Sequence, residues 1–272
     1  MSGTQDPIVQ RILSHPDDFS EGRRRELEEL GRKFFDARLN DNQFSTELPK
    51  EPHRRYWEMV VGCILLKLGL TVVNPRGGPD FKVELGGRSI WIEATSPDCG
   101  SGSDRVPDGP GWRRGDLIEL RFTNAISGKM KQCLRRIGPR DPFIIAINGY
   151  HIGRGSDAFD LCCALFGVGP LVDRFLTDEA GRLIYLETFR QGELENVKSS
   201  GEHISKAGFL DGRLERLSAV IFASVNINWP LKDIRRELRL IRNPRARNPL
   251  PPSALDRITE LQAPLTRCRY DD

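Results

Sequence analysis

The stretch that decides the fold is Gly77-Gly78-Pro79-Asp80-Phe81 together with Trp91-Ile92-Glu93-Ala94-Thr95. Its glycines and prolines end a short apolar strand predicted at 71–74. Two further strands are predicted on either side of residues 86–87, a Gly-Gly dipeptide typical of a two-residue hairpin turn. Side chains alternate between the two faces of a strand, so this hairpin can bring Asp80 and Glu93 side by side.

Two neighbouring carboxylates are the ligands that a hard cation requires. Mg²⁺ takes oxygen ligands and is commonly held by one or two protein carboxylates, with water in its other positions. The alternative is that Asp80 is a turn residue and Glu93 a solvated strand residue, since most acidic side chains lie at the surface. However, Glu93 lies in an apolar strand, where burying an unpaired charge is costly. The pattern therefore favours a site for Mg²⁺ or Mn²⁺.

A third carboxylate, Glu58, lies in an almost wholly apolar helix predicted at 54–68. It has two interpretations of about equal weight. Glu58 either interacts with the dipole at the start of this helix, or it faces the hairpin carboxylates and joins the metal site.

These residues resemble the PD-(D/E)XK nuclease superfamily, whose pattern is a helix glutamate, a Pro-Asp at the start of a strand and Glu-x-Lys on the next. Pro79-Asp80 and Glu93-Ala94-Thr95 match the pattern, within a resemblance that covers about residues 54–148. The exception is Thr95, which stands where the lysine is expected. The resemblance implies an α/β (α+β) restriction-endonuclease-like fold, a mixed central β-sheet flanked by helices, and a Mg²⁺-dependent nuclease acting on DNA.

The superfamily lysine positions water and neutralises charge, so its absence raises the question of a substitute. Lys82 is slightly preferred, because it shares a strand face with Asp80. Lys129 and Gln132 are alternatives, because the superfamily packs the helix predicted here at 116–137 beside its site. The catalytic candidates are Glu58, Asp80, Glu93, Lys82, Lys129 and Gln132, and the metal candidates are Asp80, Glu93 and Glu58.

Two other functions stay open at this point. Thr95 favours a nucleic-acid-binding protein that kept the nuclease fold and lost its chemistry, because threonine supplies no positive charge. The weaker alternative is a scaffold for protein partners in which the carboxylates are structural.

Basic residues gather in two segments, although the formal net charge is only +3. One is the Gly- and Pro-rich loop at 96–115. The other is residues 232–247, which contain seven basic and two acidic residues. Such clusters suit a phosphate backbone. The candidate nucleic-acid contacts are Arg113, Arg114, Arg121, Arg242, Arg245 and Arg247. DNA is the favoured partner, while RNA and a homodimer stay open.

The 272 residues are predicted to form an N-terminal helical arm (1–53), the nuclease-like domain (54–230) and a basic C-terminal extension (231–272). Other predicted helices are 21–39 and 157–166, and other predicted strands are 142–148, 183–187 and 217–225. No apolar run reaches the roughly 18 residues of a membrane span. The six cysteines show no metal-ligand spacing. We therefore expect a cytoplasmic protein with reduced thiols and no membrane partner.

Overall fold

The computed structural model describes residues 21–107, 114–153, 156–177, 179–192, 194–227, 232–262 and 268–269. The helices are α2 (Glu21–Asp36), α3 (Phe44–Glu47), α4 (Pro52–Lys67), η2 (Gly102–Asp104), α5 (Gly115–Cys133), η3 (Leu134–Arg136), α6 (Ala158–Phe166) and α7 (Ile234–Glu237). The strands are β1 (Thr71–Val73), β2 (Phe81–Leu85), β3 (Arg88–Thr95), β4 (Phe143–Asn148), β5 (Val168–Thr177), β6 (Leu183–Gly192), β7 (Glu195–Val197), β8 (His203–Ser205), β9 (Ala219–Ala223), β10 (Arg239–Arg242), β11 (Thr259–Glu260) and β12 (Cys268–Arg269).

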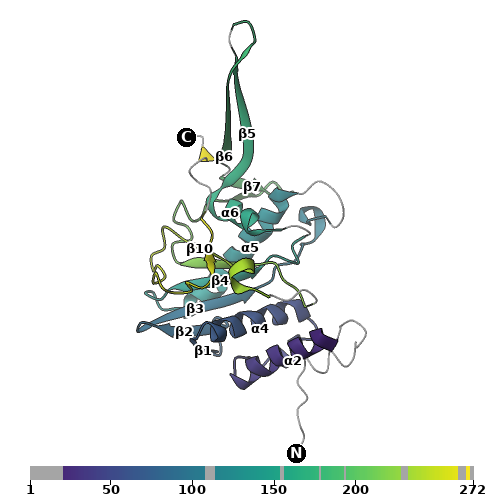
Figure 1. Ribbon diagram of the computed structural model, residues 1–272, viewed down its shortest axis with the longest axis vertical. Helices are drawn as coiled ribbons and strands as arrows, with labels where there is room; N and C mark the ends of the chain where they lie inside the picture. The colour runs from purple at the N-terminus through teal and green to yellow at the C-terminus, as the bar shows by residue number, and fades with distance from the viewer. Residues whose placement is uncertain are drawn as a thin grey trace, which may run out of the picture.

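A seven-stranded mixed sheet with the order β1-β2-β3-β4-β9-β10-β11 forms the centre of this α/β fold. Helices α2 and α4 cover one face of the sheet, and α5 and α6 cover the other (Figure 1). Each face has its own apolar core, so the sheet is buried between two helical layers. The predicted fold class, a mixed sheet flanked by helices, is confirmed.

Strands β2 and β3 form the predicted hairpin. Gly86 and Gly87 both have a positive φ, +58° and +76°, as the mirror-image turns of tight hairpins require. The register pairs Phe81 with Ile92, and both side chains join the core beneath α4. Because side chains alternate, the neighbouring Glu93 points to the opposite face, toward α5.

Strand β4 lies between β3 and β9 and is parallel to both. All six of its residues are buried, as predicted for a central strand covered on both faces. A parallel pair needs a crossover connection, and α5 provides it between β3 and β4. The crossover therefore brings α5 over the face of β3 that carries Glu93.

Helix α4 is apolar nearly all round because it is enclosed on two sides. Trp57 Nε1 donates a hydrogen bond of 2.9 Å to the carbonyl oxygen of Ala146 in β4. On the other side α4 packs against α2, where a Cβ on Gly62 would lie only 3.0 Å from the ring of Phe34. The absence of a side chain at Gly62 thus allows the two helices to approach closely.

The outer limits of the predicted central domain do not mark separate units. Helix α2, from the predicted arm, shares the core beneath the sheet, and residues 232–262 contribute β10 and β11 to the sheet itself. The predicted strand at 217–225 corresponds to β9, and beyond it the chain adds an unpredicted strand, β10, antiparallel beside β9. The basic composition of 232–247 hid this strand, in which only Leu240 and Ile241 are fully buried.

A strand was predicted at residues 183–187, and these residues lie in β6, one strand of a long hairpin. Strand β6 pairs antiparallel with β5, and β12 lies parallel to β6. This second sheet extends away from the two helical layers (Figure 1). None of the described helices is long and apolar enough to cross a membrane.

Candidate functional site

Asp80 and Glu93 lie side by side on the sheet face beneath α5. The backbone N–H of Asp80 donates to Glu93 Oε2 over 3.3 Å, and the N–H of Ala94 donates to Asp80 Oδ2 over 2.7 Å. These contacts continue the register of the hairpin by one pair beyond Phe81 and Ile92. The predicted juxtaposition of the two carboxylates is therefore confirmed, whereas their role stays a prediction.

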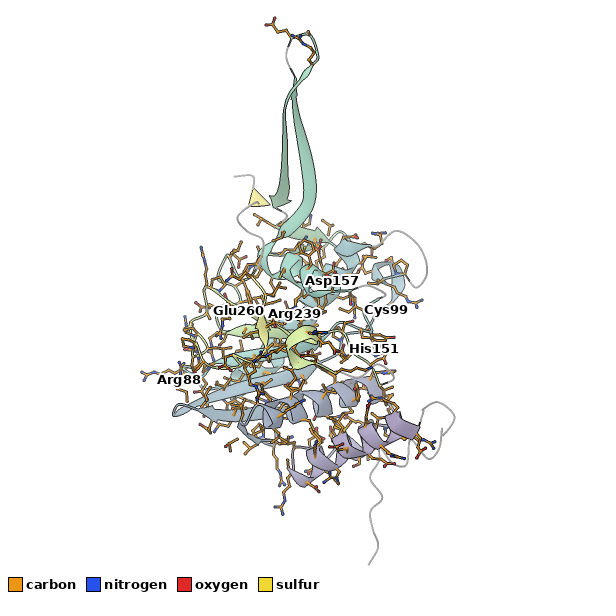
Figure 2. All side chains as sticks on the ribbon, viewed as in Figure 1. Arg88, Cys99, His151, Asp157, Arg239 and Glu260 are labelled. Carbon is orange, nitrogen blue, oxygen red and sulfur yellow. The ribbon has the colours of Figure 1, made fainter. Side chains whose placement is uncertain are left out.

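The pair lies toward the edge of the sheet at which the parallel strands β3 and β4 end. Figure 2 shows Cys99, beyond the end of β3, and His151, beyond the end of β4, at this edge, with Arg88 at the opposite one. The carboxyl ends of parallel strands are a common place for ligand sites in α/β folds.

Asp80 is held in an environment that disfavours its charge. Burial raises the pKa of Asp80 well above its ordinary value, and the negative charges of Glu93 and Glu58 raise this pKa further. The hydrogen bond from Ala94 and the charge of Lys129 act in the opposite direction but do not offset these effects. A bound cation would reverse the balance, because it favours the ionised carboxylates.

Lys129 reaches the site from α5 and forms an ion pair with Glu93 Oε1. Both side chains are largely buried, with 16% of Lys129 and 5% of Glu93 exposed. Cys133 lies one helical turn after Lys129, and burial, with a further effect of Glu93, raises its pKa to about 12. The Cys133 thiol therefore stays protonated at neutral pH.

The preference for Lys82 as the substitute lysine is not supported by the contacts of its ammonium group. Lys82 Nζ lies 2.7 Å from Glu84 Oε1 and over the ring of Trp91, 5.7 Å from its centroid. Asp80 and Glu84 are both two residues from Lys82 on this face, and the ammonium group pairs with Glu84. Of the two candidate lysines, Lys129 is the one that contacts a site carboxylate. Gln132 is exposed, one turn further along α5.

Glu58 is buried on α4 and held by one neighbour. Arg55 Nη1 donates to Glu58 Oε2 over 2.5 Å, and the same guanidinium binds Glu47 and Asp41 from the segment that precedes α4. The other oxygen, Glu58 Oε1, is buried without a hydrogen-bond partner among the described residues. Sequence reasoning missed Arg55, although its position three residues before Glu58 on a helix was a signal for this contact.

The buried Glu58 makes stability depend on pH, and this gives a first testable prediction. Burial raises the pKa of Glu58 from 4.5 to about 7, against the opposing attraction of Arg55. A carboxyl group whose pKa is higher in the folded state stabilises the fold below its unfolded pKa and loses this effect as pH rises. We expect Glu58→Gln to gain stability relative to the wild type between about pH 4.5 and 7, by up to roughly 3 kcal/mol.

Urea unfolding of both proteins, without metal, at several pH values measures this difference. Glu28→Gln is the control, because Glu28 is an exposed residue of α2. A constant difference between Glu58→Gln and wild type across this range contradicts the raised pKa.

The residues present fit a cation held by two carboxylates and water better than a cage of protein ligands. In the part of the chain that the structure describes, no three His, Cys, Asp or Glu side chains are grouped as a metal site. Asp80, which is half-buried, and the buried Glu93 nevertheless place two carboxylates together, with incomplete compensation by Lys129. Mg²⁺ accepts such a donor set, because it keeps several of its waters. Glu58 stays a predicted ligand.

Most of the predicted nucleic-acid contacts already have acidic partners. The ion pairs are Arg114–Asp116, Arg121–Asp98, Arg242–Glu260 and Arg247–Glu215. Arg245 is exposed, and Arg113 lies outside the described residues. A phosphate would have to compete with a carboxylate at four of these six positions.

Comparison with protein-family models, with curated proteins and with solved structures gives no match to this chain.

Proposed function

We propose that the chain is a divalent-cation-dependent phosphodiesterase that cleaves DNA, with a restriction-endonuclease-like core. The observation that carries this proposal is the pair formed by the half-buried Asp80 and the buried Glu93, with a lysine brought to Glu93 by the neighbouring helix. Bringing two carboxylates together away from water lowers the stability of the fold, because burial and like charge both disfavour their ionised forms. A pair that is retained despite this effect favours a functional role.

Asp80 and Glu93 would hold the cation, with Glu58 beside them as the predicted further acid. A divalent cation in such a site acidifies an attacking water and stabilises charge on the phosphate. Lys129 would orient the attacking water and neutralise developing negative charge, the task that Thr95 cannot perform. Arg55 holds Glu58 Oε2, so this carboxylate would keep a fixed orientation toward the substrate.

The alternative is a DNA-binding protein that kept the fold without its chemistry. Thr95 favours this alternative, because this residue, two positions after Glu93 in the strand, carries no positive charge. The ion pair of Lys129 with Glu93 argues against it, because it returns a positive charge to the same carboxylate from α5.

Incubation of the full chain with supercoiled and linear DNA, with Mg²⁺, with Mn²⁺ or with a chelator, tests the proposal. We expect cleavage with either cation and none with the chelator. Glu93→Gln is the matched variant, since it keeps the shape of the side chain and removes its charge. Wild-type protein that binds DNA without cutting it would support the binding-only alternative, and wild-type protein that does neither would favour the scaffold.

A further inference from the structure

Two exposed arginines flank the turn that delivers Asp80 to the site. Gly77 has a φ of +89°, and Arg136 Nη1 lies 3.5 Å from the position that a Cβ on Gly77 would take. Arg76 precedes Gly77 and has a positive φ of 45°; its backbone N–H donates to Asn74 Oδ1 over 2.9 Å. The two arginines, which come from distant parts of the sequence, thus lie around one short turn, three residues before Asp80.

Neither arginine is engaged by an acid within the described part of the chain. Among the residues that the structure describes, Arg76 and Arg136 have no ion-pair partner, and both are exposed. This distinguishes them from the arginines that the sequence singled out at 114, 121, 242 and 247, which face carboxylates. A free guanidinium binds phosphate through two parallel hydrogen bonds without first breaking an ion pair.

The position of Arg136 connects it with the candidate catalytic lysine. Lys129, Gln132 and Arg136 follow one another at helical spacing, so they lie along one side of α5 and η3. Lys129 contacts Glu93 at the inner end of this row, and Arg136 is exposed at the outer end. Seven residues of helix span roughly 10 Å, about three nucleotides of rise along one DNA strand.

Basic side chains around the carboxylates would favour the approach of DNA. Asp80 and Glu93 place two carboxylates side by side, and Glu93 pairs with Lys129. A DNA phosphate would be attracted to this place by the bound cation and by basic side chains around it. Cations at the C-terminal end of a helix also interact with its dipole, but this stabilising effect does not require their clustering at the Gly77 turn.

We propose that Arg76 and Arg136 bind the DNA phosphates that flank the one at the Asp80–Glu93 site. This inference rests on the proposed function and extends it to the direction in which the strand leaves the site, from Lys129 along α5 toward η3. We expect these contacts to form whatever the base sequence, because contacts to the phosphate backbone carry no sequence information.

The test is the salt dependence of binding by the double variant Arg76→Gln/Arg136→Gln. Fluorescence anisotropy of a short labelled DNA duplex, with Ca²⁺ in place of Mg²⁺ to limit cleavage, gives Kd over a series of NaCl concentrations. We expect the slope of log K against log salt to become shallower by about 1 for each arginine, hence about 2 for the pair. Arg25→Gln/Arg32→Gln is the matched control, because both side chains are exposed on α2.

An unchanged slope in a double variant that melts like the wild type would overturn this inference, while cleavage by the wild type would leave the proposed function intact. Loss of slope only on replacing Arg242, Arg245 and Arg247 would place the contact at the C-terminal segment and also overturn it. Wild-type protein that does not bind the duplex would overturn both the inference and the proposed function.

Discussion

Asp80→Asn is expected to abolish cation-dependent DNA cleavage and, at the same time, to make the metal-free protein more stable. The carboxamide keeps an oxygen that can accept the hydrogen bond from Ala94 and removes the charge that burial, Glu93 and Glu58 all disfavour. Removing a ligand that stabilises transition-state charge should lower the rate by at least about 10²–10³-fold. Each kcal/mol of stability gained should raise the melting temperature by roughly 2–4 °C.

The pH dependence gives this prediction a second readout. Because the pKa of Asp80 is raised in the folded state, ionisation of the wild type opposes folding as pH rises above the usual aspartate range. The stability advantage of Asp80→Asn should therefore increase with pH, and saturating Mg²⁺ should reduce it by stabilising only the wild type.

Thermal unfolding with and without Mg²⁺, beside a cleavage assay, measures both effects. Asp36→Asn on α2 is a suitable control, because the Asp36 side chain is 70% exposed. A variant that is less stable than the wild type and still cuts DNA would show that Asp80 is a structural turn residue.

The hairpin part of the site was predictable from the sequence. It depends on the alternation of side chains along a strand and on the residues that form a tight turn. The Gly86-Gly87 turn fixes the register of the hairpin, and this register decides that Asp80 meets Glu93. The apolar residues of β4 likewise require two covered faces, which predicts helices above and below the sheet. These inferences need only neighbours in the chain.

The contributions from distant elements were not predictable in the same way. Lys129 meets Glu93 across 36 positions of sequence, and this contact depends on how α5 crosses the sheet. The preference for Lys82 followed strand alternation correctly, but alternation does not say which nearby acid, here Glu84, binds the ammonium group. Strand β10 escaped prediction because its two buried residues lie between arginines, a pattern with little periodicity.

Lys129→Met is expected to reduce the cleavage rate by roughly 10²–10⁴-fold, the usual range for a side chain that positions or transfers a proton. DNA binding should change little, because this lysine faces Glu93 rather than the surface. The variant should also lose up to about 3–5 kcal/mol of stability, because Glu93 would keep a buried charge without its partner. Single-turnover cleavage at saturating DNA and Mg²⁺ separates the loss of cleavage rate from any change in DNA binding.

Lys82→Met tests the rival lysine in the same assay, and Lys33→Met on α2 is the control, since Lys33 is exposed and pairs with the exposed Glu29. A large loss with Lys82→Met and none with Lys129→Met would reverse the assignment. Equal rates for both variants and the wild type would exclude a lysine from the reaction.

A second-site change distinguishes a catalytic Lys129 from one that only compensates Glu93. Thr95 lies two residues after Glu93 on the same face of β3 and is buried, so Thr95→Lys in the Lys129→Met background would return a cation to this carboxylate from the strand. If Lys129 serves the reaction through its charge beside Glu93, the double variant should recover a large part of both stability and cleavage. Recovery of stability without cleavage would mean that Lys129 is a structural partner, and the proposed chemistry would then lack its positive group.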